Sequence, residues 1–253
     1  MEVHAHTHSV APDSHRGRKK WTHYLWEFLM LFLAVFCGFL AENQREHMVE
    51  HQREKQFIRS MIADLQDDTI ILQNTMSAIR SGSVLLDSMV TILGDKNIIK
   101  QMGDQLYYFG RVGPRLGTLS NNNRTFEQLK NSGGFRLIRN TEASNKIMDY
   151  YNSIPQIHQL EDIYTKEFDQ YKVVAAKIFD PDVFRMMETT DGTIIRGTTN
   201  PPLRTYDPEL LKELGVYAVY MNGSHRGLIM FQQALRKKGI ELIELLKEEY
   251  HLD

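Results

Sequence analysis

The stretch WTHYLWEFLMLFLAVFCGFLA occupies residues 21–41 of the 253-residue chain and decides its architecture. Its strictly apolar part, residues 28–41, would form only about 21 Å of helix, short of the roughly 30 Å core of a bilayer. A helix counted from Trp21 reaches about 31 Å, and Glu27 then lies near enough to one end to contact the headgroups. Aromatic side chains typical of a membrane interface gather at that end: Trp21, Tyr24 and Trp26. The stretch predicts a transmembrane helix over residues 21–41, with the lipid bilayer as its partner.

A stretch of this length is also compatible with a cleaved or lipid-modified signal sequence, or with a buried core helix. Signal cleavage needs small residues at the −3 and −1 positions. Cleavage after Ala41 or Gly38 would place Phe39 or Phe36 at −3. Phe36 also precedes Cys37, where a lipid-modified cysteine requires a small neighbour. An uncleaved anchor is the favoured interpretation, and the others stay as alternatives.

Basic residues on the two sides of the stretch indicate its orientation. Four lie within five residues before it, and three lie within about 15 residues after it. Because Lys and Arg are retained on the cytoplasmic side, the closer cluster favours a cytoplasmic N-terminus and a translocated C-terminal part. The residues are Arg16, Arg18, Lys19 and Lys20 before the stretch, and Arg45, Arg53 and Lys55 after it.

Residues 1–20 show no apolar periodicity and are predicted to form a disordered basic tail on the cytoplasmic side. Three histidines alternate within it: His4, His6 and His8. Such a tract can bind metal, but a flexible tail loses conformational entropy when it forms a site. A polar tail is therefore the favoured interpretation, with metal binding as the alternative.

The remaining residues, 42–253, are numerous enough for one sizeable hydrophobic core or two small ones. The net charge of −2 argues against nucleic acid as a partner, because nucleic-acid binding needs a basic face. Cys37 is the only cysteine, so no intramolecular disulfide can form. The extramembrane part must be held together by packing alone.

The clearest repeat follows the anchor, where neither Gly nor Pro occurs between residue 42 and Gly82. The anchor helix is therefore predicted to continue as a long heptad helix over 42–93. One row at seven-residue spacing is Ile58, Leu65, Leu72, Ile79, Leu86 and Leu93, and a second is Ile62, Thr69, Met76, Ser83 and Val90. Apolar neighbours widen the stripe: Phe57, Met61, Ile70, Ile71 and Leu85. A broad stripe favours an intramolecular bundle over a two-stranded coiled coil, which stays as the alternative.

Glycine, proline and capping residues divide the rest of the chain. Residues 110–124 hold three glycines and a proline, which predicts a loop and the candidate recognition surface. Thr125 and Gln128 have the spacing of a capping box, and Asp207 followed by Pro208 is a strong helix start. The predicted helices are 125–132, 141–152, 156–179 and 208–250, with an interruption at 153–155 and a loop over 180–206. The predicted fold class is all-α.

One motif, HMVEH at residues 47–51, matches the H-x-x-E-H pattern of zinc hydrolases. On a helix it places two imidazoles on one face, with a glutamate nearby as base. It lies six residues past the anchor in a charge-dense helix, so a polar face is favoured over a metal site. Two aromatic clusters, 107–109 and 150–151, are expected to be core rather than to line a pocket. No catalytic, cofactor-binding or metal-ligating residue is predicted.

The segment KKWTHYLWEFLMLFLAVFCGFLAE at 19–42 resembles the anchor of a family of uncharacterised single-span membrane proteins from Bacteroidota-type bacteria. The segment TFEQLKNSGGFRLIRN at 125–140 and the tyrosine pair at 150–151 fit the same family. The resemblance spans most of the chain through these spaced motifs. It implies no activity and no catalytic residue. It implies a compartment, the bacterial inner membrane with a helical domain in the periplasm.

Together these features predict a membrane-anchored helical interaction or scaffolding protein rather than an enzyme. Its expected partner is another protein, or a second copy bound through the helices. One alternative is a periplasmic ligand-sensing module that acts through a membrane partner. A remote alternative is a metal-dependent hydrolase built on His47, Glu50 and His51.

Overall fold

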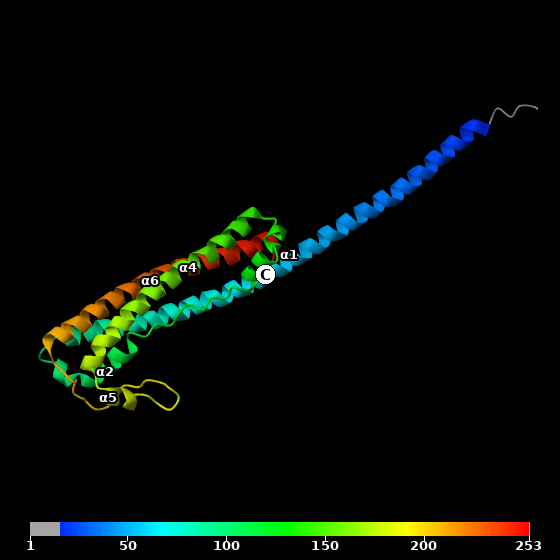
Figure 1. The fold of residues 1–253 in the computed structure, drawn as a ribbon. Coiled ribbons are helices and arrows are strands. Elements are labelled where there is room, and N and C mark those ends of the chain that lie inside the picture. The colour runs from blue at the N-terminus through cyan, green and yellow to red at the C-terminus, as the bar shows by residue number, and fades with distance from the viewer. Residues whose placement is uncertain (1–15, 253) are drawn as a thin grey trace, which may run out of the picture. The chain divides into compact units, whose positions relative to one another are not determined.

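The computed structural model describes residues 16–252, with side chains from residue 21 onward. Over these residues it contains helices and a single β-bridge but no strand, which confirms the predicted all-α class (Figure 1). The predicted tail overlaps the start of the first helix at residues 16–20, and its histidines lie outside the described residues. The elements are α1 (Arg16–Gly94), η1 (Ile99–Gln101), α2 (Gly103–Val112), α3 (Arg124–Asn131), η2 (Gly134–Leu137), α4 (Thr141–Ile178), α5 (Pro181–Met186) and α6 (Pro208–Tyr250).

The chain divides into two units, residues 1–54 and residues 55–253, and α1 contributes to both. The described part of the first unit consists of α1 alone. The apolar side chains of residues 21–41 are exposed along this helix; Phe28, for example, is 65% exposed and Val35 is 74% exposed. This part of α1 is long and apolar enough to cross a membrane.

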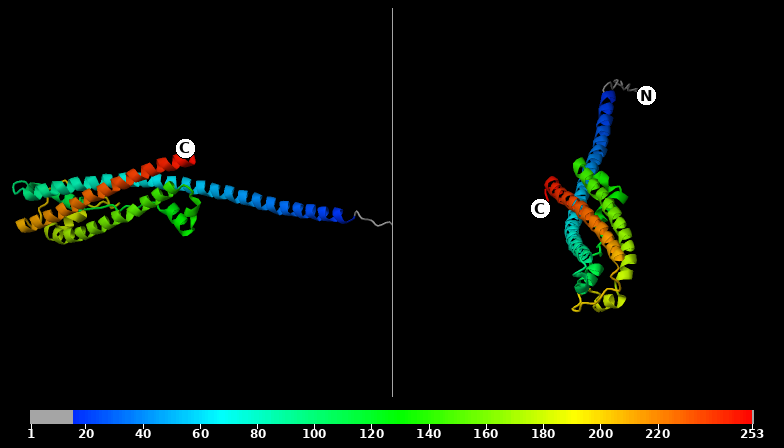
Figure 2. Two further views of the ribbon diagram at one scale, coloured as in Figure 1. Left: turned by 90° about the horizontal axis from the view of Figure 1, so that it is seen from above. Right: turned by 90° about the vertical axis from the view of Figure 1, so that its left-hand side faces the viewer.

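The second unit is a bundle in which residues 55–94 of α1 lie alongside α4 and α6 (Figures 1 and 2). The heptad row of α1 is buried from Ile58 to Leu86, and Met61, Asp68, Gly82 and Met89 form a further buried row beside it. This third row gives α1 the broad stripe that suits a bundle. The predicted packing of a long helix within an intramolecular bundle is therefore confirmed.

Two core clusters define the helix directions. Residues 58–79 of α1 pack with the first half of α4 and the second half of α6. Residues 86–92 pack with the second half of α4 and the first half of α6. Thus α4 runs parallel to α1, and α6 runs antiparallel to both. Two parallel neighbours require a connection that returns along the bundle, and residues 113–123 supply it.

Pro155 lies inside α4 without ending it, so the predicted interruption at 153–155 is wrong. The proline lacks the N–H that would bond to the carbonyl of Tyr151, a loss that costs about 3 kcal/mol in a helix interior. Pro155 itself faces solvent, whereas Ile154 and Ile157 beside it are buried. Burial contributes about 1.5–3 kcal/mol for each isoleucine, which offsets the lost bond.

The start of α6 follows its sequence signals. The Asp207 side chain accepts a hydrogen bond from the backbone N–H of Glu209 at 2.9 Å, and Pro208 occupies the first turn. Gly223 lies inside the helix at an exposed position, with no atom within 4 Å of an added Cβ. The Asn-Gly-Ser sequence at 222–224 therefore does not divide α6.

The loop predicted over 180–206 contains the short helix α5 and a β-bridge between Glu188 and Ile194. A turn through Gly192, at φ 81°, links the two bridge residues. The end of the loop is fastened to α2, because the backbone N–H of Gly103 donates to the Asn200 side chain at 2.6 Å. A Cβ at residue 103 would lie 2.0 Å from the Pro201 carbonyl oxygen, so only glycine fits there.

Candidate functional site: a loop held by buried carboxylates and an apolar groove

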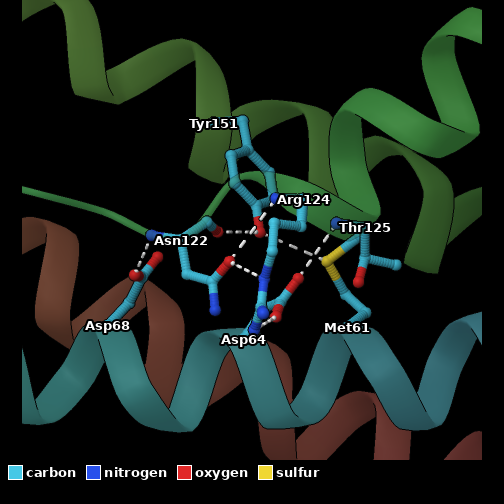
Figure 3. A network of polar contacts seen from close by, with 7 residues as sticks. All are labelled: Met61, Asp64, Asp68, Asn122, Arg124, Thr125 and Tyr151. Atoms are coloured by element: carbon cyan, nitrogen blue, oxygen red, sulfur yellow. Dashed lines mark hydrogen bonds and ion pairs between the residues drawn. The ribbon is translucent and has the colours of Figure 1, made fainter.

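The connection between α2 and α3, residues 113–123, falls within the loop predicted as the recognition surface. Leu119 is buried in it, while Arg115, Gly117, Thr118 and Ser120 are exposed. Figure 3 shows its end lying across α1, where side chains from α1 and α4 converge on the backbone. We call residues 113–123 the return loop.

Asp64 of α1 holds the start of α3. Its carboxylate accepts hydrogen bonds from the backbone N–H of Thr125 at 3.0 Å and from the Arg124 guanidinium at 3.3 Å (Figure 3). Thr125 is therefore a residue inside α3 and not its cap, and the predicted capping box is wrong, since α3 begins at Arg124 without a local side-chain cap. An acidic side chain at a helix N-terminus is stabilised by the exposed N–H groups and the helix dipole.

Asp68, one turn further along α1, holds the return loop itself. It accepts from the backbone N–H of Asn122 at 2.6 Å and from the Tyr150 hydroxyl at 3.0 Å. Burial raises the pKa of Asp68 to about 6, and these two hydrogen bonds offset part of that rise. Burial also raises the pKa of Tyr150, so the tyrosine stays a donor. Asp68 therefore binds a proton at mildly acidic pH, unlike an exposed aspartate.

Tyr151 closes the network from α4. Its hydroxyl donates to the Asn122 carbonyl at 3.2 Å and lies 3.4 Å from the Met61 sulfur (Figure 3). Its ring stacks on Phe126 of α3, with centroids 4.2 Å apart. The tyrosine pair 150–151 is buried, as expected of core aromatics.

A third buried acid holds the middle of the return loop. Glu161 of α4 accepts from the backbone N–H of Leu119 at 2.7 Å, and its other oxygen lies 2.9 Å from His158. The Tyr164 hydroxyl donates to the Pro114 carbonyl at 2.8 Å. Buried carboxylates thus satisfy three backbone donors between Leu119 and Thr125. A segment tied in this way is a structural crossover, and its exposed side chains are displayed on a fixed backbone.

The H-x-x-E-H motif lies on α1 in the first unit. His51 is half exposed and its Nδ1 lies 3.3 Å from a carboxylate oxygen of Glu54. Throughout the described part of the chain, no group of three His, Cys, Asp or Glu side chains is placed to hold a metal ion.

Buried leucines recur at seven-residue spacing along α6 at Leu228, Leu235 and Leu242. A second row, of polar and small residues, lies three residues before them and also faces the inside of the bundle. Its members are Ala218, His225, Gln232 and Gly239, all buried. The sequence analysis did not predict this polar row. The signal was available, because leucines at d positions place the residues three earlier at a positions.

His225 is the titratable residue of this row. Its ring stacks on Tyr164 with centroids 4.8 Å apart, and Nδ1 lies 3.2 Å from the Ser83 hydroxyl. Burial lowers the pKa of His225 to about 4, so the imidazole is neutral at physiological pH. Its Nε2, and both amide atoms of Gln232, find no hydrogen-bond partner among the described residues.

An apolar groove of about 570 Å³ lies on the bundle surface between the end of α1 and the start of α6. Val216, Val219 and Tyr220 on the α6 side are 53%, 52% and 64% exposed. Val90 and Leu93 form the α1 side. Contiguous exposed apolar side chains of this kind are typical of binding surfaces.

No protein-family model, curated protein or solved structure matches the chain. The family resemblance seen in residues 19–42 and 125–140 therefore stays a prediction.

Proposed function

We propose that this protein is a membrane-anchored helical interaction protein whose bundle binds a protein partner through its surface. The observation that carries the proposal is the exposed apolar segment of α1 at residues 21–41. Lipid contact for one large apolar side chain contributes about 1.5–3 kcal/mol. Ten side chains of this segment are more than half exposed, so their transfer to lipid is worth more than the whole stability of a typical domain. They are Trp21, Tyr24, Leu25, Trp26, Phe28, Met30, Leu31, Phe32, Val35 and Phe39.

The proposed orientation places the N-terminus in the cytoplasm and the bundle in the periplasm of a bacterial inner membrane. The basic cluster at residues 16–20 supports the first part through the positive-inside bias. The resemblance of residues 19–42 to an anchor of Bacteroidota-type proteins supports the compartment.

The interaction role is supported by the groove between α1 and α6. Its apolar lining is what a protein partner buries, and Tyr220 is the kind of residue that dominates binding energy at interfaces. The return loop adds exposed side chains on a backbone that two buried acids, Asp68 and Glu161, hold in place.

Membrane extraction and protease access test the anchor and its orientation. The full-length protein, with a C-terminal epitope tag, should stay in the membrane pellet through alkaline carbonate washing. Protease added to spheroplasts should remove the tag while a cytosolic marker survives. A matched pair of variants sharpens the assay: Leu31→Arg with Val35→Arg should release the protein, whereas Ile70→Arg, at an exposed position of the bundle, should not.

Recovery of the intact wild-type protein in the soluble fraction would overturn the anchor. A protected tag on a membrane-bound protein would instead reverse the orientation and leave the anchor in place.

A further inference from the structure

The face around the groove carries few charged residues. Residues 215–225 of α6 contain no Asp, Glu, Lys or Arg, and residues 81–94 of α1 contain only Asp87. Asp87 is exposed, and its carboxylate accepts a hydrogen bond from the Asn222 side chain of α6. Among the groove residues, Lys212 alone is charged, at one end.

This composition restricts what can cover the face. A partner recognised by charge would find only Asp87 and Lys212 as counter-charges. It would bury its other charged groups against apolar side chains, which is costly. The complement of such a face is another helical surface that is mainly apolar and carries few charges. Every copy of the chain carries one.

Symmetry then selects the second copy as the occupant. Two copies anchored in one membrane carry identical faces, and a twofold axis pairs identical faces with each other. Confinement to the membrane also raises the effective concentration of one face for the other. This step rests on the proposed membrane anchor.

We propose that the α1–α6 face is a homodimer interface, in which the Val216, Val219 and Tyr220 side chains of two copies pack against each other around a twofold axis. The leucine row of α6 stays inside each bundle, so pairing adds a contact between preformed bundles. Tyr220 is the central anchor, because its ring supplies the largest exposed apolar area in the groove.

Cysteine cross-linking in native membranes tests the interface. Cys37 is exposed on α1 within the anchor, so it is first replaced by serine. Single cysteines are then placed at residue 216, 219 or 220 of the full-length chain, with Gln159→Cys on exposed α4 as the control. A disulfide needs Cα atoms within about 7 Å. We expect a covalent dimer from at least one groove position and none from residue 159.

A second variant tests the packing directly. Val219→Lys would place two like charges near the twofold axis, so it should reduce the cross-linked fraction at residue 216 by at least tenfold while the bundle keeps its helical content. Val219→Leu should preserve the cross-link.

The outcomes separate this inference from the proposed anchor. Membrane-bound protein with reactive but uncross-linked cysteines at all three groove positions would overturn the dimer and leave the anchor intact. Equal cross-linking at residue 159, or adducts only to a different protein, would overturn it as well. Protein in the soluble fraction would overturn the anchor and, with it, the premise of two copies anchored in one membrane.

Discussion

Replacing Asp68 with asparagine should stabilise the bundle at neutral pH, although the carboxylate holds the return loop. Burial raises the pKa of Asp68 from 3.8 to about 6, so the folded protein binds its proton more tightly than the unfolded chain does. A tenfold change in proton affinity is about 1.4 kcal/mol, and the ionised carboxylate therefore costs about 3 kcal/mol of folding free energy. The cost is absent below about pH 4, grows as the pH rises towards 6, and is complete above it.

Asparagine removes this cost and keeps the contacts. Its carbonyl oxygen can accept from the Asn122 N–H, and its amide can donate to the Tyr150 hydroxyl, which also accepts hydrogen bonds. The expected gain is up to about 3 kcal/mol at pH 8 and close to zero at pH 4, where Asp68 is already protonated. For a unit of this size the gain at pH 8 corresponds to a rise of about 6–12 °C in melting temperature.

Urea and thermal unfolding of the full chain in detergent, followed by far-UV circular dichroism, measure this difference. The matched control is Asp67→Asn, at the exposed neighbouring position, which should change stability by less than about 0.5 kcal/mol at either pH. If Asp68→Asn were less stable than the wild type at pH 8, the ionised carboxylate would be a net stabiliser and the reasoning would fail. An equal gain at both pH values would refute the titration as its cause.

Three further predictions concern other buried groups. His225→Phe should make stability rise on acidification from pH 7 to pH 4.5, because the variant lacks the buried imidazole whose pKa, lowered to about 4, destabilises the fold as pH falls below 6.5. Urea midpoints at the two pH values measure this change, and a pH slope equal to that of the wild type would contradict it. Gln232→Leu should raise stability by about 1–3 kcal/mol, because neither amide atom has a partner among the described residues; a lower urea midpoint than wild type would count against it. Gly103→Ala should loosen the 187–206 loop and speed its proteolysis, because the added Cβ would collide with Pro201. The control Gly223→Ala, at an open position, should instead raise stability by up to about 1 kcal/mol. Equal proteolysis of the two variants would refute the steric argument.

Periodicity predicted the parts of the fold that a single helix specifies. The heptad row from Ile58 to Leu86 repeats five times, so its prediction does not depend on any single residue. The width of the apolar stripe around this row indicated a bundle. Asp207 and Pro208 predicted the start of α6 correctly, because a cap and its helix are adjacent in sequence. In each case the stabilising contact is local or repeats along one element.

The errors arose where distant residues decide the outcome. Thr125 and Gln128 have the spacing of a capping box, but Asp64 reaches the α3 backbone from 61 residues earlier in the chain. Pro155 predicted a break, but burial of its neighbours by other helices outweighs one lost hydrogen bond. The sequence of the return loop gave no sign of its restraint, because its glycines and proline are typical of any loop. Its restraint comes from acids on α1 and α4, which no local pattern in residues 110–124 reveals.

Asp68 and His225 also act on stability in opposite directions over the same pH range. Folding raises the proton affinity of Asp68, so acidification from pH 6 towards 4 favours the folded state. Folding lowers the proton affinity of His225, so acidification from pH 6.5 towards 4 favours the unfolded state. Each effect is about 3 kcal/mol, and the two nearly cancel. A flat stability profile in the wild type would therefore not mean that its buried groups fail to titrate. The single variants separate the two groups, since Asp68→Asn leaves the destabilisation by acid and His225→Phe leaves the stabilisation.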